Sequence, residues 1–523
     1  PSQFLAGFRS AMTRTGSSRG TPAWPQKMLH CCAWAVAAVA LTSLANRTFA
    51  LPSSGSGETT KLRSRTPQIL GQANGGPECG AAALNGAVVV MKPVNKNLRS
   101  SMIRAAEAEA ETEAPPPKPK KVRITAFDAI RFFLIAYIVC GHFISFAAPS
   151  QFAFKAISQI NVVVGAFFAL SGYVAAYTTT ENAERAASPK LLGTPAPKWI
   201  LQRVFGYFPL HLLVLLLFSP VFLYADVTFN GWPTAIWHGF LSAGMLQAWF
   251  PMHAEVWNAP TWFLSALTFA MALLPFALPI LAKQSKAELR RTGLFIFVIG
   301  LLPKLGYCYD HQAWGLLEGA MAPKALPNLA MFNMQRFNPF FAAIEVLLGA
   351  VACRLVMLDG AEGEEKAPKT SIASTGLPLL AMVAVIVLRA LGVLQLSDLL
   401  TRAVIFIPLF LYFLMSAHRA SVVPNVTDGI VKALSSKPLV TLGNLAFPIF
   451  VVHGPLGQVF YKKVIATKLF GGTMMALVGP QFFYAYLAIV LMSAWVLQKT
   501  FLSNKQVGTL SKDSVEKISQ WFK

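Results

Sequence analysis

Residues 127–148 read FDAIRFFLIAYIVCGHFISFAA, an apolar stretch that is long enough to cross a lipid bilayer as a helix. It contains three ionisable residues, Asp128, Arg131 and His142. At about 100° per residue, Arg131 and His142 lie on one face of such a helix, roughly 16 Å apart along its axis. If Arg131 lies near a membrane surface, His142 falls about halfway through a hydrocarbon core of roughly 30 Å. An imidazole at that depth indicates a functional site.

The composition is that of an integral membrane protein. Of 523 residues, 54% are hydrophobic and 13% are charged, with a mean hydropathy of +0.51, whereas soluble proteins average about 25% charged residues. The net charge of +22 does not indicate nucleic-acid binding, because the basic residues lie in the N-terminal part and in short loops, as the positive-inside rule predicts. The expected partner is a lipid bilayer. The six cysteines lack the spacing of a metal site or a disulfide framework, so no metal is predicted.

The apolar segments predict an all-α, polytopic bundle of about ten transmembrane helices. Residues 234–250 are predicted to be re-entrant or partly inserted, because a full crossing would put the basic residues of 283–291 on the opposite side from the earlier basic loops. After residues 127–148, the apolar segments are 160–177, 204–224, 234–250, 263–282, 293–305, 340–357, 377–394, 403–417, 439–460 and 475–497.

Residues 1–122 are predicted to form a largely disordered N-terminal leader that ends in a Pro-rich charged linker. Residues 28–50 have the short apolar core of a signal peptide, and residues 51–104 have the basic, Ser-rich and acid-poor composition of a plastid transit peptide. This favours a plastid membrane, with an endomembrane as the alternative, and fits a poorly ordered tail with one hydrophobic anchor equally well. The predicted domains are the leader (1–122), a membrane domain (123–500) and a C-terminal tail (501–523).

Several motifs follow one another in the membrane domain, and together they resemble the acyltransferase-3 family of multi-pass membrane O-acyltransferases. The first is an arginine and a histidine separated by ten residues, with an aspartate three residues before the arginine. The motifs are Asp128, Arg131 and His142; FFALSGY at 167–173, with Ser171; Arg203 before the third apolar segment; WFLS at 262–265, with Trp262 and Ser265; and His453 in LGNLAFPIFVVHGPLGQVF at 442–460.

The resemblance implies an enzyme that transfers groups other than aminoacyl groups. It would move an acyl group, with acetyl expected, from acyl-CoA to a hydroxyl of a carbohydrate or lipid acceptor. Acyl-CoA is then a co-substrate, and no bound cofactor is expected. By the same resemblance, His142 is catalytic, Arg131, Asp128 and Arg203 bind the donor or shape the site, and Ser171, Trp262, Ser265 and His453 support it.

The residues themselves allow this chemistry. Acyl transfer from a thioester to a hydroxyl needs a base for the hydroxyl and stabilisation of the developing oxyanion. A neutral His142 fits the base, or a nucleophile that forms an acyl-histidine. Arg131 suits a donor phosphate or an ion pair with Asp128. In a second interpretation, that ion pair is structural and His142 is simply a buried histidine with satisfied hydrogen bonds.

Two positions depart from the family pattern, and other interpretations remain open. Gly206 stands where a second arginine is usual, and Leu267 stands where many members have a glutamate, for which Glu255 or Glu345 could substitute. The chain could instead be a transporter or permease, because buried Arg and His also line transport paths, or an inactive family member that acts as a scaffold.

Structural roles are also predicted for three of the supporting residues. Ser171 is expected to serve helix packing more than chemistry. Arg203 fits an anchor at the membrane interface as well as a donor site. For His453, the simpler role is a hydrogen bond to a carbonyl group of a helix bent by Pro448 and Pro455.

Overall fold

The structure is a computed structural model that describes residues 122–180, 196–321, 325–361, 371–422, 428–462, 465 and 478–522. From Arg123 onward, these residues belong to one compact unit. Apart from Val122, the predicted leader lies outside the described residues, and so do its signal and transit segments. The division of the chain into 1–122, 123–500 and 501–523 stays a prediction.

The described residues form helices and no β-strand, which confirms the predicted all-α fold. Nine helical segments among them are long and apolar enough to cross a membrane, or ten if a bent pair counts as one span. This agrees with the prediction of about ten spans. The long helices are α3 (Ala126–Phe143), α5 (Ile160–Thr179), α7 (Phe208–Ala243), α8 (Trp262–Lys283), α9 (Lys286–Asp310), α11 (Pro339–Ala361), α12 (Ile372–Ala390), α14 (Ile407–Val422), α17 (Ala446–Tyr461) and α19 (Pro480–Leu497).

Shorter helices connect or extend these. The short α-helices are α4 (Gln151–Ile157), α6 (Ala196–Val204), α10 (Leu329–Phe337), α13 (Asp398–Leu400), α15 (Gly429–Leu434), α16 (Lys437–Asn444) and α20 (Lys505–Gln520). The 3-10 and π-helical segments are η2 (Ile144–Ala147), η4 (Gln247–Trp249), η5 (Pro251–His253), η6 (Ala259–Thr261), η7 (Glu318–Ala320), η9 (Thr401–Phe406) and η11 (Gln498–Leu502).

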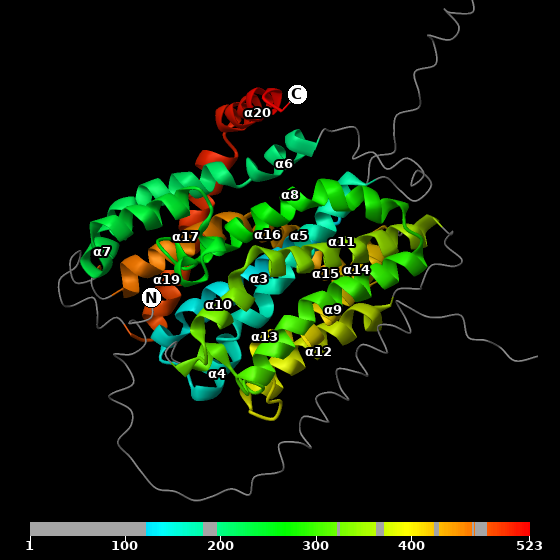
Figure 1. Ribbon diagram of the computed structural model, residues 1–523, viewed down its shortest axis with the longest axis horizontal. Helices are drawn as coiled ribbons and strands as arrows, with labels where there is room; N and C mark the ends of the chain where they lie inside the picture. Colours follow the sequence, from blue (N-terminus) through cyan, green and yellow to red (C-terminus); the bar gives the residue numbers. More distant parts are fainter. Residues whose placement is uncertain are drawn as a thin grey trace, which may run out of the picture. The chain divides into compact units, whose positions relative to one another are not determined.

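Helices α3, α5, α8 and α11 form the centre of this unit, with α7, α17 and α19 on one side and α9, α12 and α14 on the other (Figure 1). Small residues allow α5 and α11 to pack closely. A Cβ atom at Gly172 would overlap the backbone of Val346, and one at Gly349 would overlap the backbone of Ala169. The small residues of the FFALSGY motif therefore bring two helices together, as predicted.

Helix α7 is a hairpin of two antiparallel arms. The chain turns at Gly231, whose φ of 77° and ψ of 168° break the helix. His211 Nε2 on the first arm lies 2.9 Å from the carbonyl oxygen of Ser242 on the second, and His238 Nδ1 lies 2.7 Å from Asp226 Oδ2. At 1.5 Å per residue, the second arm is about 18 Å long, too short to cross the hydrocarbon core. This agrees with partial insertion of residues 234–250.

The late apolar segment 439–460 is divided into α16 and α17, which meet at an angle of 51°. The break lies at Leu445, three residues before Pro448. Pro455 lies inside α17, which continues past it to Tyr461. Because proline has no N–H, the carbonyl of Val451 loses its helical donor. Asn258 Nδ2 donates to this carbonyl instead, at 2.9 Å.

Candidate active site

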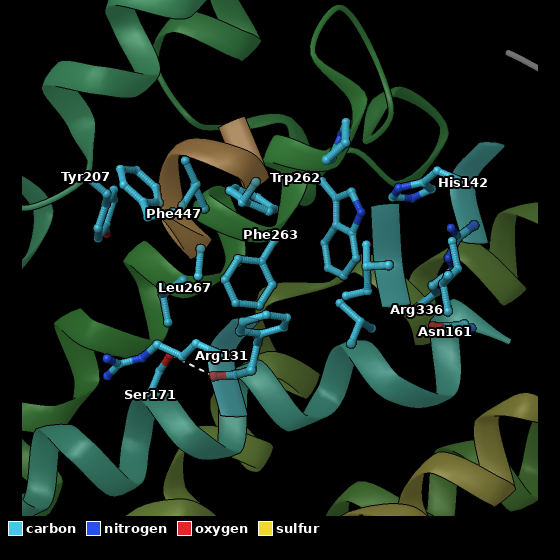
Figure 2. Close-up of a pocket in the computed structure, with 18 residues that line it drawn as sticks. Arg131, His142, Asn161, Ser171, Tyr207, Trp262, Phe263, Leu267, Arg336 and Phe447 are labelled. Carbon is cyan, nitrogen blue, oxygen red and sulfur yellow. Dashed lines mark hydrogen bonds between the residues drawn. The ribbon is translucent and has the colours of Figure 1, made fainter. Parts of the chain in front are cut away.

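A cavity of about 200 Å³ lies between α3, α5, α8, α10 and α17. Its middle is apolar and aromatic, with Phe167, Phe263 and Phe450 in the wall. Figure 2 shows polar groups at its two ends: Arg131 and Ser171 at one, and His142 and Arg336 at the other. Both side chains that the sequence motif on α3 singled out, Arg131 and His142, thus line one cavity.

His142 is hydrogen-bonded to His453. His142 Nδ1 lies 3.1 Å from His453 Nε2, and the two imidazole rings stack with their centroids 5.2 Å apart. The two residues are far apart in the chain, and α17 carries His453 to the inner face of α3 beside the cavity. His453 itself is fully buried and does not line the cavity.

The backbone around His453 determines where the protons of this pair lie. His453 Nδ1 lies 2.8 Å from the carbonyl oxygen of Phe450 and 3.1 Å from that of Ile449. Carbonyl oxygens only accept hydrogen bonds, so Nδ1 of His453 carries the proton and its Nε2 is an acceptor. His142 must therefore donate from Nδ1, which leaves the lone pair of a neutral His142 on Nε2. The predicted hydrogen bond from His453 to a carbonyl exists, and through it His453 sets the tautomer of His142.

At the other end of the cavity, Arg131 pairs with Asp128. Arg131 Nη1 lies 2.8 Å from Asp128 Oδ1, and Arg123 Nη2 lies 2.8 Å from Asp128 Oδ2. Two guanidinium groups thus share one carboxylate, which leaves this cluster with a formal charge of +1. The side chain of Arg131 is 35% exposed, so it can still reach an anionic group of a ligand.

Arg203 does not line the cavity but lies at the same end of the bundle as Arg131. Its Nη2 donates to Thr178 Oγ1 at 2.9 Å, and its guanidinium lies over the Trp199 ring. Thr178 is in the last turn of α5, and α5 is placed beside the first turn of α3 by contact between the Phe127 and Tyr173 rings. The arginine that precedes the third apolar segment therefore adds positive charge at that end.

Of the other predicted site residues, Ser171 and Trp262 line the cavity and Ser265 does not. Ser171 lines the cavity, but its hydroxyl donates to the carbonyl of Phe167 at 2.7 Å, within its own helix. Trp262 lines the cavity and packs on Phe337. Ser265 does not line it; its Oγ accepts a hydrogen bond from the backbone N–H of Ala248 at 3.2 Å. Ser265 thus anchors the segment between α7 and α8.

Leu267, which stands at the position of the usual family glutamate, lines the cavity. Neither candidate substitute acid does so. Glu345 forms a two-pronged ion pair with Arg402, at 2.7 and 2.6 Å. Glu255 contacts the cavity only through Arg336, whose Nη2 lies 3.0 Å from Glu255 Oε1. No acid in the described part of the chain therefore lines the cavity where Leu267 lies.

Arg336 is a cavity residue that the sequence analysis missed. It lies on α10, just before the apolar segment 340–357, and its Nη1 pairs with Glu318 Oε1 at 2.6 Å. Asn161 Nδ2 donates to Glu318 Oε2 at 2.7 Å, and Arg402 Nη1 donates to Asn161 Oδ1 at 3.2 Å. The only signal in the sequence was an arginine just before an apolar segment, which is also the pattern of an ordinary interfacial anchor.

The segment between α7 and α8 contacts both α10 and α17. Glu255 pairs with Arg336, the carbonyl of Trp257 accepts a hydrogen bond from Gln458 at 2.6 Å, and Asn258 donates to Val451. This segment therefore connects α10 to α17.

Among the residues that the structure describes, no group of three or more His, Cys, Asp or Glu is arranged to hold a metal ion.

Comparison with known proteins identifies the family of this chain. The family model of an acyltransferase domain, Acyl_transf_3, matches residues 124–499. The match covers most of the chain and includes every residue that lines the cavity. Curated proteins and solved structures gave no match.

Proposed function

Because the chain belongs to the acyltransferase-3 family and is a multi-pass membrane acyltransferase, we propose that it transfers an acyl group from acyl-CoA to a hydroxyl. The acyl group is acetyl, and the acceptor is a carbohydrate or a lipid. The observation that carries this proposal is the His142–His453 contact, which leaves Nε2 of a cavity-lining His142 as a base. The proposed activity needs such a base next to a cavity that admits a thioester.

In the proposed reaction, His142 Nε2 takes the proton of the acceptor hydroxyl while the hydroxyl oxygen attacks the thioester carbon. The tetrahedral intermediate then collapses and the C–S bond breaks. The proton on Nε2 passes to the departing sulfur, which gives the ester and CoA and restores neutral His142. His453 stays in one tautomer throughout, because the carbonyls of Ile449 and Phe450 hold its proton on Nδ1.

The donor is proposed to enter from the Arg131 end. The cluster of Arg123, Asp128 and Arg131 has a formal charge of +1, and Arg203 lies at the same end of the bundle, so this end attracts phosphates. The apolar middle of the cavity would hold the uncharged arm of the donor. With its phosphates at Arg131, a donor lying along the cavity would have its thioester near His142.

The test is acyl transfer by the purified protein with acetyl-CoA and a panel of glycan and lipid acceptors. His142→Ala, in protein that inserts into the membrane normally, should abolish both CoA release and product formation. His311→Ala is the matched control, because His311 lies at the end of α9 and does not line the cavity; it should keep the rate. Acyl transfer by His142→Ala would reject His142 as the base. Wild-type protein that consumes no acetyl-CoA with any acceptor would favour a transporter or an inactive scaffold.

For the compartment, we propose a plastid membrane, with an endomembrane as the alternative. The composition of residues 1–122 supports this. A fusion of these residues to a fluorescent protein, imaged in cells that contain plastids, tests it. Fluorescence outside plastids and endomembranes would reject both locations.

A further inference from the structure

We propose that Arg336 is a second catalytic residue, whose guanidinium stabilises the negative charge that develops on the thioester oxygen. The inference rests on the proposed function, because it assigns a partner to the base His142. It also names a residue outside the motifs from which the family was identified.

The first support is position. Among the described residues that line the cavity, two are arginines, Arg131 and Arg336. Arg131 lies at the end opposite His142, whereas Arg336 lies at the same end as His142 (Figure 2). Of the two arginines in the cavity, Arg336 is therefore the one on the side where His142 would remove the acceptor proton.

The second support is that Arg336 is held firmly. Its side chain is 13% exposed, and its two ion pairs come from two different loops, with Glu255 at 3.0 Å and Glu318 at 2.6 Å. Its guanidinium carbon lies 4.3 Å from the centre of the Phe337 ring, and Phe337 in turn packs on Trp262. A donor fixed in advance stabilises a developing charge without reorganisation during the reaction.

The third support is contrast with neighbouring arginines. Arg389 and Arg402 are also buried and paired with acids, Asp398 and Glu345 respectively, but neither arginine lines the cavity. Arg389 also donates to Gln159 Oε1 and to the carbonyl of Leu396, and Arg402 donates to Asn161 Oδ1, all inside the bundle. In Arg336, the two ion pairs use only part of the N–H groups of the guanidinium, and the remainder can donate to an oxyanion in the cavity.

The step balances as follows. The acceptor oxygen forms a bond to the thioester carbon as its proton moves to His142 Nε2, and the electron pair of the C=O bond moves onto the carbonyl oxygen. Arg336 donates hydrogen bonds to that oxyanion. When the C=O bond forms again, the C–S bond breaks and sulfur takes the proton from Nε2. Arg336 stays protonated throughout.

The experiment compares two variants of the full-length protein. The triple variant Arg336→Gln/Glu255→Gln/Glu318→Gln removes the arginine together with the two charges that it balances, so that no carboxylate is left unpaired in a buried place. The double variant Glu255→Gln/Glu318→Gln keeps Arg336. We expect the triple variant to lose on the order of 10²-fold in kcat, as for the loss of one oxyanion donor, with little change in KM for acetyl-CoA. The double variant should lose much less.

Two further measurements separate catalysis from folding. Added guanidinium ion should restore part of the rate of Arg336→Ala, whose shortened side chain leaves room for it. Arg419→Gln removes an arginine that pairs with Asp359 away from the cavity, and it should keep the wild-type kcat. A triple variant with wild-type kcat, equal losses in the triple and double variants, or no rescue by guanidinium would each overturn the proposal. Activity in His142→Ala would instead overturn the proposed function.

Discussion

His142 and His453 form a stacked, hydrogen-bonded pair, with 16° between their ring planes and 3.1 Å between Nδ1 of the first and Nε2 of the second. His142 Nδ1 donates to His453 Nε2, and His453 Nδ1 donates to the carbonyls of Ile449 and Phe450. A buried backbone carbonyl thus determines which nitrogen of His142 is free for chemistry. Under the proposed function, His453 is therefore a positioning residue.

Replacing His453 by Ala should therefore lower kcat by roughly 10²-fold, at the low end of what a general base contributes. Without the acceptor at Nδ1, His142 can place its proton on Nε2 and lose its role as a base. His453→Gln, whose Oε1 can accept the hydrogen bond from Nδ1, should recover part of the rate. The measurement is kcat and its pH profile for both variants. Equal kcat in the Ala and Gln variants would contradict this role for His453.

Asn258 should be coupled to Pro455 through the carbonyl of Val451. Asn258→Ala leaves that buried carbonyl without a donor, which costs about 1–3 kcal/mol, so the melting temperature of the detergent-solubilised protein should fall. In a Pro455→Ala background the new backbone N–H can donate to Val451, so the same Asn258→Ala change should cost less. A double-mutant cycle of melting temperatures measures this coupling. Additive effects of the two changes would count against it.

Glu318 should make the stability of the protein depend on pH. The pKa of Glu318 is raised from 4.5 to about 7, mainly by burial; the nearby Asp398 and Glu255 also raise it, and Arg336 and the hydrogen bond from Asn161 lower it. The folded protein therefore holds this proton more tightly than the unfolded chain does. The stabilisation is complete below about pH 4.5 and is lost as the pH rises through about 7.

In Glu318→Gln that contribution is absent, so the melting temperature should fall less between pH 5 and pH 8 than it does in the wild type. Asp513→Asn, at an exposed position on α20, is the matched control and should leave the pH dependence unchanged. Parallel curves for Glu318→Gln and the wild type would show that Glu318 does not titrate in this range.

Gly231 should be required by the turn of the α7 hairpin. Its φ of 77° and ψ of 168° lie in a region that only glycine adopts readily, and a Cβ there would meet only Pro233 Cδ, at 4.0 Å. Gly231→Ala should therefore destabilise the protein by about 1–3 kcal/mol through the backbone alone. Gly306→Ala is a suitable control, because Gly306 is inside α9 with no atom within 4 Å of its Cβ position. Equal melting temperatures of the two variants would refute this requirement.

The parts of the fold that could be predicted from sequence are those set by local pattern. A run of about 20 apolar residues identifies a spanning helix wherever it lies, and the spacing of Arg131 and His142 on one helix face follows from helix geometry alone. The small residues around Ser171 also predict close helix packing without knowledge of the partner helix.

The rest depends on contacts between distant segments. Arg336 is held by Glu255 and Glu318, which come from two separate loops, and Asn161 on α5 orients Glu318; no spacing in the chain indicates that these residues meet. The hairpin of α7 could not be predicted from the sequence for a related reason. Its two arms were predicted as separate segments, 204–224 and 234–250, but their antiparallel pairing depends on one backbone conformation at Gly231.

The segment between α7 and α8 joins the two halves of the proposed chemistry. Glu255 forms an ion pair with Arg336 of α10, and three residues later Asn258 donates a hydrogen bond to α17, the helix that carries His453. His453, which positions the proposed base, and Arg336, the proposed oxyanion donor, are therefore both held by this one segment. A compound or antibody fragment that displaces this segment would disturb Arg336 and His453 together. The segment is therefore a target for an inhibitor that does not enter the cavity.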